Sequence, residues 1–321
     1  MTTHNWGILG TGTIASEFAT MLREKDRTIY SVGSRTQAKA DDFANQHGVT
    51  YAHGSYDSFF QDEQIDIVYI ATPHSNHYEL IERSLQQGKH VLCEKAITVN
   101  GAQLKKLMKI AIERSLILME AMTIYHMPLY KKIKDKLVSG EMGALKMIHV
   151  TFGSYKDDDA NNRFFNPELA GGALLDIGTY ALSFTRFFLS SQPTEIQTMV
   201  KPFHTGVDEQ STILLRNDLD EMATVSLAFR AKMPKRGMLI CEKGFIHIDD
   251  FPRAVKAVVT VTSGATETIE TSVTTDALRY EAVAMEQAIL TGKPAYLQLS
   301  KDVMDLMDRI RHAWGISSSV E

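Results

Sequence analysis

The chain has 321 residues, of which 44% are hydrophobic and 23% charged, and its formal net charge is -5. These values are typical of a folded soluble protein and exclude extensive disorder. Usual domains have about 100 to 200 residues, so we expect two domains, at 1–122 and 123–321. Because lysine and arginine are not in excess, nucleic acid is excluded as an expected partner.

Cysteine usage and hydropathy bear on the compartment. Cys93 and Cys241 are too few for a disulfide framework, and neither belongs to a Cys-x-x-Cys pair, which favours a reducing environment. The start of the chain does not resemble an export signal, and we find no apolar stretch of the ~20 residues that a membrane span needs. We therefore expect a cytoplasmic protein with no membrane partner.

Short apolar runs alternate with amphipathic stretches up to about residue 122. We expect strands at residues 6–9, 28–33, 65–71, 90–93 and 117–120. This rhythm predicts parallel strands with helical crossovers, and the nearly continuous apolar run at 65–71 predicts a central strand covered on both faces. The fold class is therefore α/β, beginning with a doubly wound parallel sheet of the Rossmann type.

The first expected strand leads directly into Gly10-Thr11-Gly12-Thr13-Ile14, and a helix-like run follows from Ser16. Glycines in this position let the backbone turn tightly under a pyrophosphate and present helix amide groups to it. The pattern alone also occurs in ordinary turns, but a preceding strand and a second strand about 20 residues later favour a dinucleotide site. Gly10, Gly12, Thr13 and Ile14 are the expected cofactor contacts.

The end of the second strand bears on which dinucleotide is bound. Enzymes that prefer NAD usually place a carboxylate there, whereas this chain has Ser34-Arg35-Thr36. A guanidinium, hydroxyls and free amides would bind a 2′-phosphate that a carboxylate would repel, so these residues predict an NADP site. The alternative is an exposed arginine at a helix start.

The pattern changes after Met127-Pro128. A helix is expected at 129–139, followed by strands at 146–152, 195–201, 211–215, 223–229, 238–241, 245–248 and 255–261. Short turns between these runs predict a mostly antiparallel open sheet in an α+β domain. We expect two closing helices, 277–291 and one capped by Ser300. An open sheet face is available to a partner subunit, so we expect a homo-oligomer, a dimer or higher.

Three further segments carry polar residues where we expect a cofactor-binding sheet to end, namely Ala71–His77, Gly88–Ala96 and Gly171–Tyr180. Ligands bind outside the carboxyl ends of strands in such sheets. Together with the glycine turn, these segments resemble the Gfo/Idh/MocA oxidoreductase family. Met119–Met122 and Ala170–Tyr180 look most like its dimeric dihydrodiol dehydrogenase branch. The resemblance covers essentially the whole chain.

The resemblance implies hydride transfer between NADP(H) and a hydroxyl or carbonyl carbon of a small sugar, polyol or trans-dihydrodiol. It places the active site at the seam of the two domains. It implies that the cofactor is contacted by further residues, which are Ala71, Thr72, Pro73, His74, His77, Glu94 and Lys95. Glu94 could instead orient Lys95 or hold neighbouring backbone.

Hydride transfer at such a carbon must be matched by proton transfer at its oxygen. A tyrosine hydroxyl, with a usual pKa of ~10, becomes a usable acid and base when a lysine ammonium stabilises its phenolate. The resemblance assigns this pair to Tyr180 and Lys95, with tyrosine standing where many members of the family have histidine. Asp176 lies four residues before Tyr180, so on a helix it shares a face and a catalytic role with it. The alternative for Tyr180 is an aromatic anchor at a domain seam.

A glycine within this expected helix, Gly178, costs about 1 kcal/mol relative to alanine, which predicts that something packs closely against it. His74 and His77 have a spacing compatible with metal binding, but the absence of suitably spaced partners leads us to expect no metal. By resemblance, His77 is a candidate substrate contact, although an ordinary helix-start histidine is nearly as well supported. Arg163 could meet an anionic substrate or the cofactor, or remain an exposed loop residue.

The family commonly has proline after Glu-Lys, whereas this chain has Ala96. Because a cis bond before a residue other than proline costs about 2.5 to 4 kcal/mol, we expect a trans Lys95–Ala96 bond, with Lys95 still beside the nicotinamide. Two alternative functions are a non-catalytic NADP sensor and an NAD-linked inositol-type dehydrogenase. Arg35 and Tyr180 disfavour the second alternative.

Overall fold

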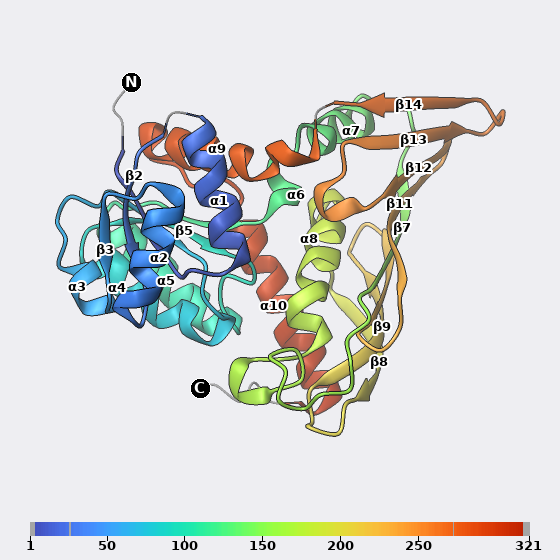
Figure 1. The fold of residues 1–321 in the computed structure, drawn as a ribbon. Coiled ribbons are helices and arrows are strands. Elements are labelled where there is room, and N and C mark those ends of the chain that lie inside the picture. Colours follow the sequence, from blue (N-terminus) through green and yellow to red (C-terminus); the bar gives the residue numbers. More distant parts are fainter. Residues whose placement is uncertain (1–3, 26, 272, 317–321) are drawn as a thin grey trace. The chain divides into compact units, whose positions relative to one another are not determined.

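The computed structural model describes residues 4–25, 27–271 and 273–316 (Figure 1). The chain divides into two compact units. The first contains the described residues up to Thr98 together with Ala102–Ala121 and Leu278–Leu297. The second contains Val99–Gly101, Met122–Ala277 and the described residues from Gln298 onward. A single boundary near residue 122 does not capture the return of Leu278–Leu297 to the first unit.

Among the described residues, the first unit contains a six-stranded sheet in the order β3-β2-β1-β4-β5-β6. Its strands are β1 (Trp6–Leu9), β2 (Ile29–Gly33), β3 (Tyr51–His53), β4 (Ile67–Ile70), β5 (His90–Glu94) and β6 (Leu118–Ala121). Neighbouring strands pair in parallel, which confirms the expected doubly wound Rossmann sheet. The strand order reverses between β1 and β4, and ligands bind such sheets at the carboxyl ends of the strands there.

The helices of the first unit are α1 (Thr13–Glu24), α2 (Gln37–His47), α3 (Tyr56–Phe60), α4 (His77–Gln86), α5 (Gly101–Glu113) and α9 (Ala277–Thr291). A short 3-10 turn, η1 (His74–Asn76), precedes α4. The late helix α9 joins the core because Leu278, Ala282 and Met285 share one apolar cluster with Trp6 of β1.

In the described part of the second unit, eight strands form a sheet in the order β14-β13-β12-β11-β7-β10-β9-β8. The strands are β7 (Leu145–Gly153), β8 (Glu195–Pro202), β9 (Asp208–Arg216), β10 (Met222–Ala228), β11 (Met233–Cys241), β12 (Gly244–Asp249), β13 (Lys256–Val261) and β14 (Thr266–Glu270). β7 and β10 pair in parallel, and the other neighbours are antiparallel. The expected, mostly antiparallel sheet is confirmed.

The second unit contains α6 (Thr123–His126), α7 (Pro128–Val138), α8 (Thr179–Phe188) and α10 (Leu297–Trp314), and a π-helical turn, η3 (Leu174–Gly178), leads into α8. Short 3-10 turns are η2 (Pro167–Leu169), η4 (Phe251–Arg253) and η5 (Thr274–Asp276). Figure 1 shows α8 and α10 along one face of the sheet. Apolar side chains that remain exposed on the strands include Met199, Leu214, Met222 and Phe245.

Three details differ from the sequence-based expectations. β3 was not expected because it has only three residues, and β14 was not expected because its alternating threonine and glutamate residues lack an apolar pattern. Ser300 was expected to cap the last helix, and this is wrong: α10 begins at Leu297, so Ser300 lies buried inside its first turn.

Candidate active site

The glycine turn of the first unit has the geometry of a phosphate cradle. Gly10 has a φ of +105°, and a Cβ there would lie 2.4 Å from the carbonyl oxygen of Ala71, so a side chain is excluded. Gly12 is the N-cap of α1, and a Cβ placed on it would meet no atom within 4 Å. The amide groups of Thr13 and Ile14 open that helix. Space beside an open helix N-terminus fits a pyrophosphate.

The end of β2 carries the residues expected to select the dinucleotide. Ser34 is 6% exposed, and its amide donates to the carbonyl oxygen of His53 at 3.0 Å, which fixes the turn. Arg35 is exposed, and Thr36 is the N-cap of α2. Ser34, Arg35 and Thr36 therefore form the connection between β2 and α2.

Lys95 follows β5 on a segment held by its neighbours. The expectation of a trans Lys95–Ala96 bond is wrong, because the structure has a cis bond there. Histidine contacts accompany this conformation: the carbonyl oxygen of Lys95 lies 3.1 Å from Nε2 of His74, and that of Ala96 lies 2.9 Å from Nδ1 of His77. Ala96 is buried, while Lys95 remains partly exposed.

Two buried carboxylates hold the same segment. Glu94 accepts a hydrogen bond from the Tyr69 hydroxyl at 2.5 Å and from the Lys95 amide at 3.2 Å. Glu120 accepts from the amide of Ile97 at 3.0 Å. Burial and the neighbouring Glu94 raise the pKa of Tyr69 well above its usual range, so this phenol stays a donor. The roles of Tyr69 and Glu120 were not predicted, because both residues read as parts of apolar strands.

The His77 ring contacts the backbone of two loops. Its Nδ1 meets the carbonyl oxygen of Ala96, and its Nε2 lies 2.9 Å from the carbonyl oxygen of Thr72. The ring is fully buried, and this burial lowers its pKa while the carbonyl contacts act in the opposite direction. Because both ring nitrogens face backbone oxygens, this arrangement does not favour the substrate role suggested for His77. Thr72 and Pro73 lie in the loop between β4 and η1.

In the second unit, Tyr180 is the second residue of α8, and Asp176 lies in the π-helical turn before it. Both side chains are partly exposed, whereas Ile177 is buried. The expectation of close packing at Gly178 is confirmed, because a Cβ there would lie 2.8 Å from Cδ1 of Leu227. The continuous α-helix assumed for this segment is replaced by a π-turn, a feature often found at functional sites.

Asp208, at the start of β9, anchors the beginning of this turn. Its Oδ2 accepts a hydrogen bond from the Leu174 amide at 2.6 Å. Gly172 has a φ of +120°, and a Cβ on it would lie 2.3 Å from Oδ1 of Asp208, so the loop needs glycine there. Burial raises the pKa of Asp208 to about 7, against the opposing effects of the backbone amides and of Arg311.

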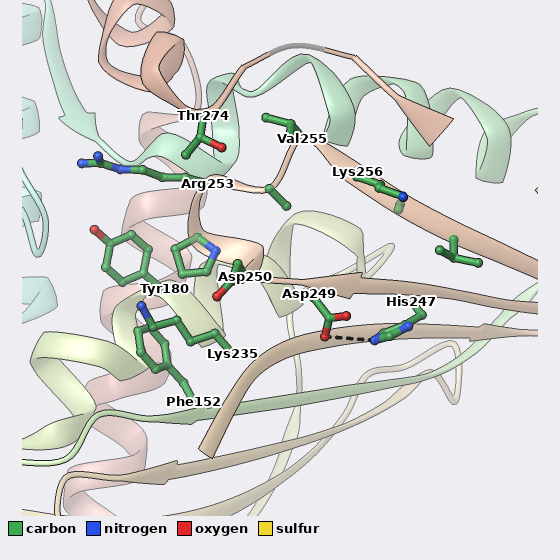
Figure 2. A pocket seen from close by; sticks show the side chains of 14 residues that line it. Phe152, Tyr180, Lys235, His247, Asp249, Asp250, Arg253, Val255, Lys256 and Thr274 are labelled. Carbon is green, nitrogen blue, oxygen red and sulfur yellow. Dashed lines mark hydrogen bonds and ion pairs between the residues drawn. The ribbon is translucent and has the colours of Figure 1, made fainter. Parts of the chain in front are cut away.

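Tyr180 lines a cavity of about 890 Å³ that lies entirely within the second unit (Figure 2). Its ring centroid lies 6.2 Å from that of Phe152, whose face also carries the Lys235 ammonium at 5.3 Å. The walls come from β7, α8, β11, β12, η4, β13 and η5. Arg163 does not line this cavity; it is exposed and its guanidinium lies over the ring of Phe164 at 4.3 Å.

No group of three or more His, Cys, Asp or Glu residues is arranged to hold a metal ion among the residues that the structure describes. In that same part of the chain, no helix combines the length and the apolar character needed to cross a membrane.

Comparison with known proteins agrees with the fold. Residues 4–122 match the model of an oxidoreductase family with an NAD-binding Rossmann fold, and residues 130–247 match the GFO/IDH/MocA C-terminal domain. The trans-1,2-dihydrobenzene-1,2-diol dehydrogenase of Xenopus laevis is 32% identical over 299 residues, which is 89% of each chain. The chain belongs to the Gfo/Idh/MocA oxidoreductase family. The resemblance inferred from the sequence is confirmed, and the chain is an enzyme of a family that acts on CH-OH groups.

Two further proteins are similar to this chain. The human trans-1,2-dihydrobenzene-1,2-diol dehydrogenase is 31% identical and aligns with 76% of this chain and 73% of its own. Among solved structures, KijD10, a 3-ketoreductase from Actinomadura kijaniata in complex with NADP and TDP-benzene, is 23% identical. It has a TM-score of 0.86 and covers 97% of this chain and 98% of its own. This last likeness concerns the fold.

Proposed function

We propose that this enzyme is an NADP(H)-dependent dehydrogenase or reductase acting on a small sugar, polyol or trans-dihydrodiol. The observation that carries the proposal is the phenol of Tyr180, which lines a cavity of about 890 Å³ at the start of α8, directly after a turn that the buried carboxylate of Asp208 holds. A hydroxyl that borders a roomy cavity suits proton exchange with a substrate oxygen. The names of the dihydrodiol dehydrogenase relatives support this reaction class.

The first unit supports the cofactor part of the proposal. The cradle of Gly10 and Gly12 fits a pyrophosphate, and Arg35 fits the additional 2′-phosphate of NADP. The loops at Ala71–His77 and Glu94–Lys95 would contact the rest of the cofactor. When bound, the nicotinamide supplies or accepts the hydride. KijD10, which shares the fold, was crystallised with NADP.

The protein's own residues would move the proton. Tyr180 would give a proton to the substrate oxygen during reduction and take it back during oxidation. Lys95 would stabilise the phenolate when it stands beside Tyr180 in the complex with both ligands, and Asp176 would orient the substrate or the phenol. The hydrogen bonds around Glu94, Glu120, His74 and His77 hold the backbone that carries Lys95.

We also propose that the two parts of the chain have different roles. Residues 1–122 would bind NADP, and residues 123–321 would bind the substrate and a partner subunit. Exposed apolar residues on the strands of the second sheet, such as Met199 at 81% and Leu214 at 42% exposure, support a homo-oligomer formed through this sheet. Light scattering of the purified protein tests this part.

The function is tested by adding NADPH or NADP to purified protein with a panel of carbonyls, sugars and diols and following nicotinamide absorbance. With any active substrate, Tyr180→Phe should lower kcat about 100-fold or more with NADPH binding retained, because the variant lacks the exchangeable proton. Tyr155→Phe, at an exposed tyrosine of the same unit, is the matched control. Near-normal turnover by Tyr180→Phe eliminates this role. NADPH binding without turnover on the whole panel favours a sensor.

A further inference from the structure

The cavity beside Tyr180 is lined by three cationic side chains, Lys235, Arg253 and Lys256. They come from β11, η4 and β13, segments that the fold brings together from different parts of the sequence. The whole chain carries a formal net charge of -5, so this concentration of positive charge opposes the overall balance. A local excess of cations in a concave site attracts anions.

Acidic residues of the same cavity offset part of this charge. Two carboxylates, Asp249 and Asp250, also line it. Asp249 is paired, because its Oδ1 lies 2.8 Å from Nε of Arg236 and 3.2 Å from Nε2 of His247. Arg236 does not line the cavity, so its charge offsets Asp249 from outside. With three cationic side chains and two carboxylates, the lining has a formal excess of one positive charge.

Two of the cations, Lys235 and Arg253, lie on the same side of the cavity as the candidate proton donor. Phe152 lies between Lys235 and Tyr180: its ring centroid lies 6.2 Å from that of Tyr180 and 5.3 Å from the Lys235 ammonium. Figure 2 shows Tyr180, the Lys235 ammonium, the Arg253 guanidinium and the Asp250 carboxylate at one end of the cavity, and Lys256 with the Asp249–His247 pair toward the other end. A cavity of about 890 Å³ also has room for more than the reacting carbon and its hydroxyl.

We propose that the substrate of this enzyme carries an anionic group, a carboxylate or a phosphate, which Lys235 and Arg253 bind while the reacting oxygen meets Tyr180. The inference rests on the proposed function and narrows its substrate class to sugar acids, sugar phosphates and similar anionic hydroxy compounds. The planar guanidinium of Arg253 can bind two oxygens of such a group, and Lys235 supplies a point charge from the other side. Lys256 extends the positive field along the cavity.

The test compares three hexoses that differ in one substituent: D-glucose, D-glucuronate and D-glucose 6-phosphate. Their binding to the NADPH-loaded protein is measured by titration calorimetry at low and high salt, and hydride transfer is followed separately. Glucuronate and glucose 6-phosphate distinguish a carboxylate from a phosphate site. The variants are Lys235→Gln and Arg253→Gln, and Lys243→Gln is the control that removes an exposed lysine outside the cavity.

We expect at least one anionic hexose to bind about tenfold more tightly than glucose, with the advantage falling at high salt. Lys235→Gln and Arg253→Gln should reduce it to about twofold or less, and Lys243→Gln should leave it unchanged. Equal binding of the three hexoses, no saturable binding of either anion, or an advantage that survives both cavity variants overturns the inference. Turnover of uncharged diols without an anionic preference leaves the proposed function intact. Anion binding without hydride transfer to any substrate refutes only the proposed function.

Discussion

Replacing Asp208 by asparagine should change how the stability of the protein depends on pH. Burial raises the pKa of Asp208 to about 7 from an ordinary value of 3.8, and its Oδ2 holds the Leu174 amide at the start of the turn before Tyr180. The folded protein therefore keeps this carboxyl protonated over a pH range in which the unfolded chain has already released the proton.

The sign follows from proton linkage. Between about pH 4 and pH 7 the folded state holds one more proton at Asp208 than the unfolded state, so raising the pH favours unfolding. At 1.36 kcal/mol for each pKa unit, the group lowers the free energy of unfolding by about 4 kcal/mol across this range. Below pH 4 and above pH 7 its contribution no longer changes.

Asparagine has the same shape and an oxygen for the Leu174 amide, but it does not titrate in this range. Relative to the native protein, Asp208→Asn should therefore gain about 4 kcal/mol between pH 4 and pH 8, in addition to any constant offset. Denaturant unfolding followed by circular dichroism at several pH values measures this slope, and exposed Asp218→Asn serves as the control. A constant difference between Asp208→Asn and the native protein across the range would refute the reasoning.

Three other predictions concern the cofactor site and the core. Arg35→Asp should lower kcat/KM for NADPH about 100-fold and for NADH less than about threefold, since it replaces a phosphate-binding cation by a repelling anion; equal losses would contradict NADP selection. Gly178→Ala should lower the free energy of unfolding by about 1 to 3 kcal/mol in a denaturant titration, because its Cβ would lie 2.8 Å from Leu227; a stabilised variant would refute the close packing. Burial lowers the pKa of His126 to about 4, so stability should fall by about 3 kcal/mol as the pH drops from 6.5 to 4. His126→Gln should remove that loss. A variant that loses as much stability as the native protein between pH 6.5 and pH 4 would contradict this prediction.

Features that depend on local patterns were predictable from the sequence. The run at β4 is apolar because both faces are covered, and the glycine turn after β1 has to pass beneath the Ala71 carbonyl. Each signal lies within a few neighbouring residues, so its periodicity or its glycine spacing is enough. The alternation of the first half and the turn-separated strands of the second half were predicted for the same reason.

Contacts between distant segments were not predictable in this way. Asp208 and the Leu174 amide are 34 residues apart, and the cavity joins β7, β11 and η4 around Tyr180. Nothing in the composition of these segments distinguishes Lys235 or Arg253 from other surface cations. The cis Lys95–Ala96 bond was not predicted either, because a peptide bond before alanine intrinsically prefers the trans form. The histidines that contact this segment come from another loop.

The most direct measurement is a crystal structure of the enzyme with NADPH and an unreactive substrate analogue. The proposed mechanism predicts the Tyr180 hydroxyl and the Lys95 ammonium within about 3 to 4 Å of each other and of the analogue's oxygen, beside the nicotinamide ring. A fully liganded complex in which either group lies remote from that ring would contradict the mechanism.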